Sequence, residues 1–338
     1  MVMGMLNAIF VIIGTVIGAG FASGKEVFTF FNVYGVAGLL GLIFSEAMIG
    51  LIIYKSFCII INYNVSSYSQ FVSRIFPQSK FLNNTFCNII NIFLLISFIV
   101  MVAGFSAYFA QEFYLPYIFG GIIISFLSFV TFLNNVDGLV KINLFLVPCL
   151  IFIILLLGFK NWICFTNFNF ISSKNNFSWF IMSLLYASYN LIVLLPILVS
   201  LKKYIPTQKH AKNVAFLTFV FLILMTIILF FLLNYYFTDI QNIELPTIFI
   251  AGKLGTFYQY ACGLLILGAI FTTAISNGYS FLENLNISRR KVYCLMSFSI
   301  CLIAVVLSHI GFSTLLNLLY PILGLLRFYT NYIYLIFF

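Results

Sequence analysis

The chain has 338 residues, of which 63% are hydrophobic and only 7% are charged, and its mean hydropathy is +1.15. A soluble domain carries roughly a quarter charged residues, so this composition excludes one. Backbone polar groups inside a bilayer must be satisfied within the protein, and the apolar runs of roughly 18–28 residues are helix-length rather than strand-length. The sequence therefore predicts an all-α integral membrane protein.

Taken in chain order, the apolar runs predict ten transmembrane helices joined by short polar connectors. They lie at residues 4–31, 35–60, 84–111, 115–134, 138–159, 177–200, 212–236, 255–281, 292–309 and 312–336. No connector is long enough for a separate soluble domain, so residues 1–338 are expected to form a single transmembrane domain. Residues 65–76 predict a short amphipathic helix in the inner interface, and residues 239–254 predict a helix-turn on the outer face. Each of these connectors could be an ordered loop or a moving gate.

The net charge of +9 comes from basic residues between the spans, so it indicates orientation rather than binding to nucleic acid. With the N-terminus inside, three lysines lie outside, namely Lys160, Lys174 and Lys253. Twelve basic residues then lie inside, namely Lys55, Arg74, Lys80, Lys141, Lys202, Lys203, Lys209, Lys212, Arg289, Arg290, Lys291 and Arg327. The positive-inside rule therefore predicts that both termini of this multi-pass protein are cytoplasmic.

The first span is predicted to break in the middle of the membrane. Four glycines, Gly14, Gly18, Gly20 and Gly24, fall within eleven residues, and glycine costs roughly 0.5–1 kcal/mol relative to alanine inside a helix. The alternative is close helix packing, because two of the glycine spacings match the small-residue packing motif. However, Lys25 and the following acid come directly after the cluster, and charges at such depth usually face a protein interior or a water-filled cavity. A broken helix at a binding site explains both features.

A broken helix offers two kinds of ligand group. The half-helix before the break exposes carbonyl oxygens that can bind a cation, and the half-helix after it exposes amide N–H groups where the dipole favours an anion. A zwitterionic amino acid or a similar carboxylate, coupled to Na⁺, suits this arrangement.

Transporters built around such breaks often consist of two inverted repeats. Ten spans divide into five plus five, which predicts repeats at residues 1–160 and 175–338 and makes span 6 the partner of span 1. Its midplane residues are polar, namely Tyr186, Ser188, Tyr189 and Asn190. Since Pro196 removes a backbone donor, span 6 is expected to be discontinuous as well. A polar patch that joins helices together is the alternative.

Two further spans carry polar groups at depth. In span 8, the adjacent hydroxyls of Thr272 and Thr273 could ligate Na⁺ as hard oxygen donors, or could bond to their own helix backbone. In span 2, Glu46 must pair, form hydrogen bonds or be protonated. It could satisfy the backbone donors freed at the breaks, or it could carry a proton.

Residues 13–26 (IGTVIGAGFASGKE) resemble the first helix of YkvI-type bacterial membrane proteins. Residues 186–190 (YASYN) and 320–324 (YPILG) are similar to the same group. That group in turn resembles the amino acid–polyamine–organocation superfamily. The resemblance implies the fold of sodium-coupled leucine transporters, which has two inverted five-helix repeats with helices 1 and 6 discontinuous. Within that fold, residues 14–20 (GTVIGAG) are similar to the leucine transporter's Gly-Asn-Ala-Val-Gly-Leu-Gly.

The resemblance also implies a sodium site. The carbonyls of Gly14 and Ile17 would ligate Na⁺ from the first span. The Ala269 carbonyl and the hydroxyls of Thr272 and Thr273 would complete the site from span 8.

For the solute, the resemblance implies that the amides of Ala19 and Gly20 bind a carboxylate. The candidate substrate-binding residues are therefore Ala19, Gly20, Phe21, Ser23, Lys25, Tyr186, Ser188, Tyr189 and Asn190, with Glu26 and Glu46 as a polar network. Lys25 departs from the pattern, because an amine beside the site could replace a sodium ion or bind an acidic substrate. The coupling ion is thus Na⁺ or H⁺.

The sequence accordingly predicts a secondary active transporter for an amino acid or a related small organic solute, a Na⁺-coupled symporter that works by alternating access. The alternative is a non-transporting amino-acid sensor on the same fold. An enzyme is not expected, because no span carries clustered metal ligands or a nucleophile beside a base. We expect no resident cofactor, and the expected partners are a small-molecule substrate and the lipid bilayer, with no nucleic acid.

Overall fold

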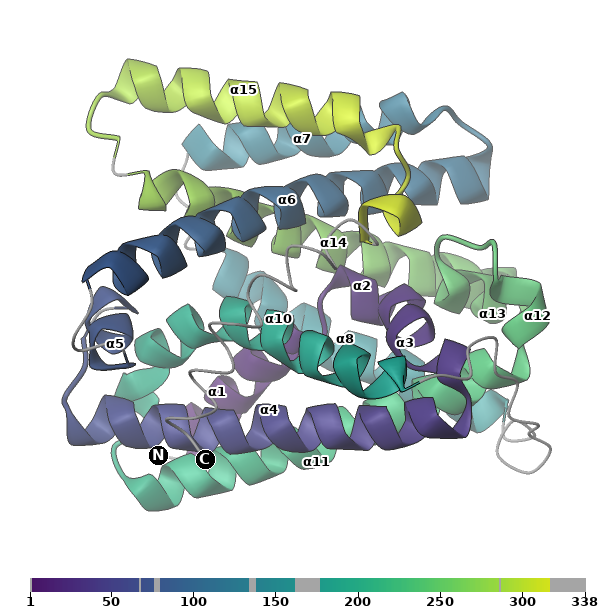
Figure 1. Ribbon diagram of the computed structural model, residues 1–338. Helices are drawn as coiled ribbons and strands as arrows, with labels where there is room; N and C mark the ends of the chain where they lie inside the picture. The colour runs from purple at the N-terminus through teal and green to yellow at the C-terminus, as the bar shows by residue number, and fades with distance from the viewer. Residues whose placement is uncertain are drawn as a thin grey trace.

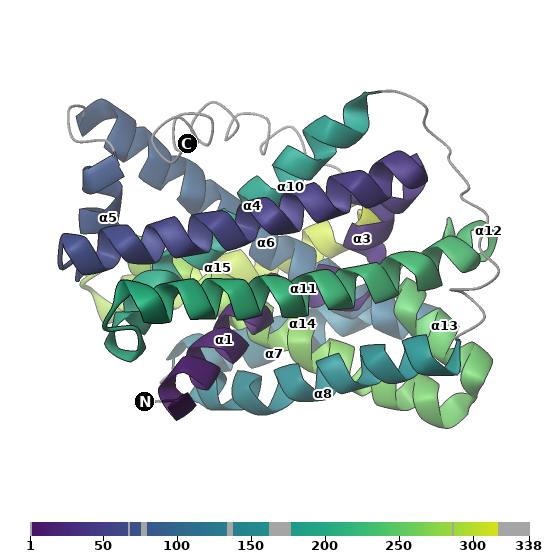
Figure 2. The ribbon, with the colours of Figure 1, turned by 90° about the horizontal axis from the view of Figure 1, so that it is seen from below.

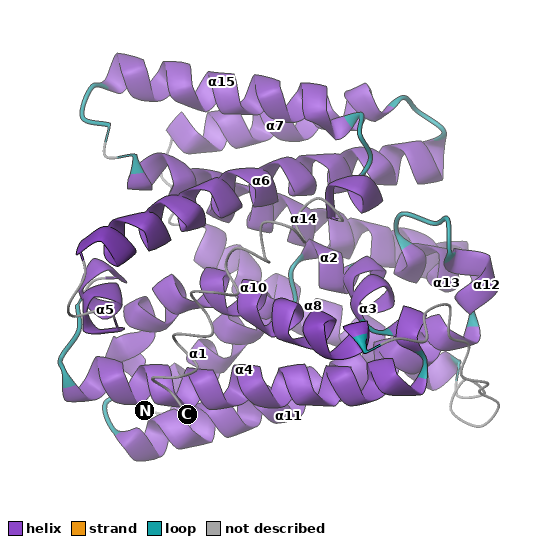
Figure 3. Ribbon diagram, viewed as in Figure 1, coloured by secondary structure: helices purple, strands orange, loops and turns teal. Residues whose placement is uncertain are grey.

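A computed structural model describes residues 2–66, 68–75, 80–133, 138–161, 177–285 and 287–316. Within these ranges the regular structure is entirely helical (Figure 3). The long helices lie side by side in a bundle (Figures 1 and 2), as backbone groups that are hidden from water require. The predicted all-α class is confirmed.

Eight long helices make up most of the bundle that the described residues form. They are α4 (Val36–Asn62), α6 (Lys80–Phe113), α7 (Tyr117–Leu133), α8 (Gly138–Lys160), α10 (Ser178–Ser200), α11 (Gln208–Tyr235), α14 (Thr256–Asn284) and α15 (Arg290–Ser308). In the described part of the chain, six helices are long and apolar enough to cross a membrane. Together with the composition, they make this a multi-pass membrane protein.

The predicted spans agree with the helices as far as the described residues reach. Spans 1 to 9 each coincide with a helical segment, although span 3 begins earlier than expected, at Lys80. Of the tenth predicted span, residues 312–316 are described, and they are helical. The rest of that span, including the segment 320–324, lies outside the described residues.

The helices form an inner group and an outer layer. In the inner group, α4 packs against α10 and α11, and α6 packs against α14. The outer layer consists of α7 and α15, which pack against each other and against α6, at the top of Figure 1. Large apolar side chains of this layer are exposed, such as Phe126 and Leu295, both at 64%. Such side chains suit a surface that faces lipid.

The first span is broken, as the glycine cluster predicts. It consists of α1 (Val2–Val16), α2 (Ala19–Ala22) and α3 (Lys25–Phe30), followed by the 3-10 turn η1 (Asn32–Tyr34). The second interruption is at Gly24, whose φ of 78° is in the left-handed region that favours glycine. The chain therefore changes direction twice between Val16 and Lys25.

The prediction that span 6 is discontinuous is wrong. Helix α10 runs without interruption from Ser178 to Ser200 and contains Pro196. Its polar side chains bond to the helix itself: Ser188 Oγ donates to the Leu184 carbonyl at 2.6 Å, and Asn190 Nδ2 to the Tyr186 carbonyl at 3.0 Å. These groups are satisfied in an intact helix, so they indicate no break.

The two patterned connectors are helical and lie at opposite ends of the bundle (Figures 1 and 2). Helix α5 (Tyr68–Ile75) lies at one end, near the 3-10 turn η2 (Leu201–Tyr204). Helices α12 (Phe237–Ile240) and α13 (Pro246–Leu254) lie at the other. The bundle thus has two chemically distinct ends.

Candidate functional site

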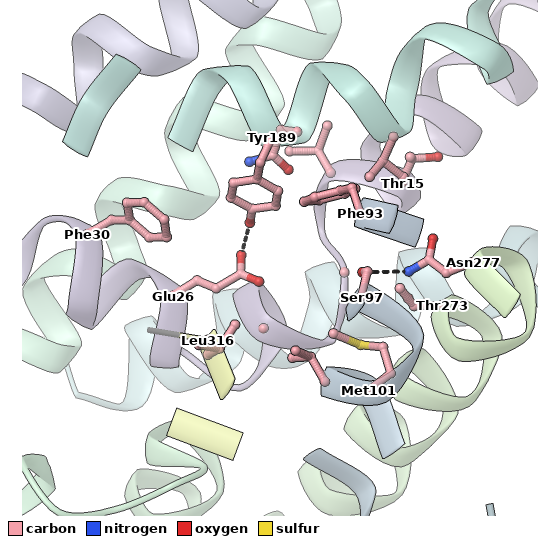
Figure 4. A pocket seen from close by; sticks show the side chains of 16 residues that line it. Thr15, Glu26, Phe30, Phe93, Ser97, Met101, Tyr189, Thr273, Asn277 and Leu316 are labelled. Carbon is pink, nitrogen blue, oxygen red and sulfur yellow. Dashed lines mark hydrogen bonds between the residues drawn. The ribbon is translucent and has the colours of Figure 1, made fainter. Parts of the chain in front are cut away.

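A cavity lies at the break in the first span. It is lined by residues on both sides of the break and by residues of α6, α10 and α14 (Figure 4). The cavity volume is about 50 Å³, which is enough for several water molecules or part of a small solute. The cavity lies where the helical backbone is interrupted, and Gly18 and Gly20 of the break line it.

Glu26 is the acidic group of this cavity. The side chain is only 7% exposed, and Tyr189 of α10 donates its hydroxyl to Oε2 (Figure 4). Oε1 lies against Gly20, where an added Cβ would be 1.8 Å from that oxygen. The Glu26 carboxyl group therefore occupies the space that a side chain at position 20 would need.

An aromatic cluster is centred on Tyr189, the residue that donates to this carboxyl group. The Phe30 ring stacks on the Tyr189 ring with 5.9 Å between centroids, and Phe93 of α6 lies 6.4 Å from the same ring. Tyr186 lies behind them with its ring edge-on to Tyr189 at 5.6 Å. Aromatic rings thus line the cavity beside the carboxyl group, together with aliphatic side chains such as Val193 and Leu316.

The other end of the cavity is polar and uncharged. Asn277 of α14 donates through Nδ2 to Ser97 Oγ of α6 at 2.8 Å. Thr273, one helical turn before Asn277, also lines the cavity and lies beside Gly18, with its Oγ1 3.9 Å from the place of an added Cβ. A threonine of span 8 therefore faces the break in span 1.

The predicted sodium residues are brought only partly together. Helix α14 packs against α2, and Thr273 faces the break. The Thr272 hydroxyl instead donates to the Ala269 carbonyl of its own helix at 3.2 Å. A bond to the helix backbone was the alternative to Na⁺ ligation for span 8. Gly14 packs against α8, and Ile17 follows the last residue of α1. The ligand roles of these five residues stay predictions.

The last carbonyls of α1 and the first amides of α2 have no partner within their own helices. Ile17 N still donates to the Ile13 carbonyl at 2.7 Å, and Ala22 N donates to the Gly18 carbonyl at 2.9 Å. The hydrogen-bond ladder of α1 thus ends at the Ile13 carbonyl, and that of α2 begins at the Gly18 carbonyl. The break thus has the carbonyl end and the amide end that the glycine cluster predicts, and Ala19 and Gly20 begin the amide end.

Three of the predicted substrate residues, Gly20, Tyr189 and Asn190, line the cavity. Five others do not line it, namely Phe21, Ser23, Lys25, Tyr186 and Ser188. Of Ala19, only the backbone is described. Ser23 Oγ donates to the Gly20 carbonyl at 2.9 Å, and Phe21 is buried in the core. Tyr186 and Ser188 are occupied within the aromatic cluster and within α10.

Lys25 is placed away from the cavity. Its Nζ donates to the Ile243 carbonyl at 2.7 Å, in the connector between α12 and α13. Although Lys25 and Glu26 are neighbours in sequence, they lie on different sides of α3. The structure therefore separates the amine from the carboxyl group at the break.

Glu46 does not contact the break, so the expectation that it satisfies backbone donors there is wrong. It is fully buried between α4 and α11, where Thr226 Oγ1 lies 3.1 Å from Oε1. Its Oε2 is buried without a hydrogen-bond partner in the described part of the chain. The Thr226 hydroxyl thus holds Glu46 at the interface between α4 and α11. A role as proton carrier stays a prediction.

Phe30, Phe93, Ser97 and Asn277 belong to the site but were not predicted from the sequence. Helices that are apolar on all faces give no periodic signal for the face that lines a cavity. Asn277 could have been predicted as a site residue, because amide side chains are rare inside apolar runs.

No family model matches the chain. The chain is homologous to two proteins of Bacillus subtilis (strain 168). It is 26% identical over 331 residues to YkvI, an uncharacterized membrane protein, covering 93% of this chain and 90% of that one. It is 24% identical over 322 residues to the uncharacterized protein YyaD, covering 94% and 92%. The resemblance seen in the first span therefore extends over nearly the whole chain.

Among solved structures, the chain is similar to a Na⁺-coupled sialic acid symporter in a substrate-bound, outward-open state. The TM-score is 0.56 with 11% sequence identity, over 96% of this chain and 76% of the symporter. At that identity the similarity shows the fold alone. That fold is the leucine-transporter-like fold which the resemblance implies.

Proposed function

We propose that this protein is a secondary active transporter that carries an amino acid or a related small organic solute across the bacterial plasma membrane by alternating access. The observation that carries the proposal is the cavity at the break in the first span, enclosed by α3, α6, α10 and α14. In transporters built in this way, the substrate binds near the bilayer midplane at a discontinuous helix, where backbone groups are free to contact it.

We further propose that transport is coupled to Na⁺. The break supplies carbonyl oxygens at the end of α1, and Thr273 supplies a hydroxyl from α14 on the same side of the cavity. Hard cations prefer such oxygen ligands. For Thr272 to join the site, its hydroxyl would have to turn from the Ala269 carbonyl toward the ion.

The packing of the helices supports two inverted repeats. Exchange of the repeats would relate span 1 to span 6, span 2 to span 7, span 3 to span 8 and span 4 to span 9. The helices of each of these pairs pack against each other: α1 with α10, α4 with α11, α6 with α14, and α7 with α15. Such contacts are expected if a two-fold axis passes between the members of each pair. Spans 1, 2, 6 and 7 would then move against spans 3, 4, 5, 8 and 9.

The test is uptake of radiolabelled amino acids into proteoliposomes that contain the purified protein, with and without an inward Na⁺ gradient. We expect Na⁺-dependent accumulation that the double variant Thr272→Ala, Thr273→Ala abolishes. The matched control is Thr131→Ala, because that hydroxyl donates to the Leu127 carbonyl of its own helix at 2.7 Å, on the exposed side of α7.

Uptake without Na⁺ dependence would remove sodium coupling from the proposal and leave the transporter. Binding without uptake would instead indicate the non-transporting sensor.

A further inference from the structure

The described residues that line the cavity include one acidic side chain, Glu26, and no basic one. The nearest lysine in sequence, Lys25, is held at the Ile243 carbonyl by its Nζ. A carboxylate buried at membrane depth is costly unless a positive charge or hydrogen-bond donors compensate it. Within the cavity, the Tyr189 hydroxyl supplies one donor. The site is thus short of positive charge.

Glu26 also lies where a substrate carboxylate was expected. Its Oε1 fills the space beside Gly20, one of the two residues whose amides the resemblance assigns to an anion. A second carboxylate bound at these amides would be close to Glu26, and like charges at short range repel each other. The observed arrangement therefore disfavours recognition of the solute through an anionic group at this position.

The aromatic side chains suit a cation as well. Phe30, Phe93 and Tyr189 line the cavity beside Glu26, as Figure 4 shows. The faces of aromatic rings attract ammonium groups. Tyr189 donates to Oε2, and an ammonium group, which has three N–H donors, could donate to either oxygen of this carboxylate.

We propose that the cavity recognises its solute by an ammonium group bound to the Glu26 carboxylate, and that a carboxylate on the solute is not required. Tyr189 is a positioning residue, because it orients the carboxylate through Oε2. The biological role of this ammonium site rests on the proposed transport function. Binding to the site can be tested without transport.

The test compares three probes of nearly equal size that differ in charge. L-Alanine carries both charges, L-alaninamide carries only the ammonium group, and L-lactate carries only the carboxylate. Binding of each to the purified full chain in lipid nanodiscs is measured by the shift of the melting temperature and by titration calorimetry, since a ligand of the folded state raises its apparent stability. We expect L-alanine and L-alaninamide to bind and L-lactate to bind at least roughly tenfold more weakly.

The variant Glu26→Gln keeps the shape of the side chain and removes its charge. It should weaken the binding of L-alaninamide by roughly tenfold or more, because a hydrogen bond to a charged group is lost. Tyr189→Phe, which leaves the charge but frees Oε2, should have a smaller effect. The matched control is Glu244→Gln. Glu244 accepts hydrogen bonds from Ser313 N at 2.8 Å and Ser313 Oγ at 2.6 Å and does not line the cavity, so this variant should bind as the native chain does.

Equal binding of L-lactate and L-alaninamide, or no binding of L-alaninamide, would overturn the proposal. The comparison of probes on the native chain decides this even if Glu26→Gln unfolds. Failure of the transport function looks different: L-alaninamide binds in a Glu26-dependent manner, but none of the three probes enters proteoliposomes. Conversely, uptake of L-lactate that is unchanged in Glu26→Gln would support transport and contradict the ammonium site.

Discussion

Gly18 and Gly20 are two residues apart in the same break, but the space beside them differs. An added Cβ at Gly20 would lie 1.8 Å from Glu26 Oε1, whereas at Gly18 the nearest atoms are 3.9 Å away. We therefore expect Gly20→Ala to displace the Glu26 carboxyl group and to lower the free energy of unfolding by about 1–3 kcal/mol. Gly18→Ala is the control and should change it by much less. Chemical denaturation in detergent micelles measures both, and equal losses would mean that the glycines serve only the bend of the backbone.

The contacts of Thr226 indicate the protonation state of Glu46. The Thr226 hydroxyl bonds to the Leu222 carbonyl of its own helix and also lies 3.1 Å from Glu46 Oε1. A hydroxyl has one hydrogen to donate. Both contacts are satisfied if Thr226 donates to Leu222 and a protonated Glu46 donates to Thr226.

We accordingly expect Glu46 to be a neutral acid at pH 7. Infrared spectroscopy of the protein in lipid should show the carbonyl band of a protonated carboxyl group, and this band should disappear in Glu46→Gln. The glutamine keeps the shape and the lack of charge, so its stability should be near that of the native chain. A large loss of stability in Glu46→Gln, with no such band in the native protein, would indicate an ionised Glu46.

At the residue scale, the sequence could place charges at the break but could not say where they point. Lys25 and Glu26 are adjacent, and successive residues of a helix differ in direction by about 100°. One therefore faces the cavity and the other faces the connector before α13, according to packing that only the folded chain determines. The same limit applies to Phe93 and Ser97, since α6 is apolar on every side and gives no periodic pattern.

At the element scale, α13 closes the second interruption of the first span. Thr247 N donates to the Ser23 carbonyl at 3.0 Å, and Thr247 Oγ1 donates to the Ala22 carbonyl at 2.8 Å. These are carbonyls at the end of α2, where helical donors are missing. The connector 239–254, which was expected to be an ordered loop or a moving gate, is therefore attached directly to the break.

We expect Thr247→Val to loosen this attachment. The valine has a similar shape but no hydroxyl, so the Ala22 carbonyl loses its donor and the free energy of unfolding should fall by about 1 kcal/mol. Hydrogen–deuterium exchange should increase in residues 243–254 more than elsewhere. Thr247→Ser keeps the hydroxyl and is the control. Unchanged exchange in Thr247→Val would show that the backbone contact at Ser23 is sufficient.

Helix α10 shows why one break could be predicted and the other could not. In the first span, glycine both weakens the helix and permits the φ found at Gly24. In span 6, polar residues and a proline are ambiguous, because in a membrane such side chains can satisfy an intact helix, as Ser188 and Asn190 do. Composition alone does not separate these cases.

The continuity of α10 has a measurable consequence. Pro196 lies inside the helix, where it removes a backbone hydrogen bond. Pro196→Ala should therefore leave stability unchanged or raise it, by up to about 3 kcal/mol. Pro246→Ala is the contrast, because Pro246 is at the start of α13, a favourable position for proline, and its loss should not stabilise. A clear loss of stability in Pro196→Ala would mean that the fold needs a kink at this position.

At the scale of the whole molecule, the two ends of the bundle differ in charge and in contacts. At the α5 end, Lys202 Nζ donates to Asn64 Oδ1 at 2.5 Å and to the Val65 carbonyl at 2.9 Å. Lys203 and Lys209 follow along the chain at the same end. The other end holds Glu112, which accepts from Gln259. Basic residues thus cluster at the α5 end, and the positive-inside rule predicts that this end is cytoplasmic.

Cysteines introduced at the two ends test this orientation. Ser73 lies in α5, and Tyr114 lies between α6 and α7 at the opposite end with 92% of its side chain exposed. In intact bacterial cells, a membrane-impermeant thiol reagent should label Tyr114→Cys and should label Ser73→Cys only after lysis. The parent chain with its seven native cysteines is the control for background labelling. The reverse pattern would place the basic end outside and invert the membrane orientation of the whole bundle, so that the cavity at the break would have its α13 side toward the cytoplasm.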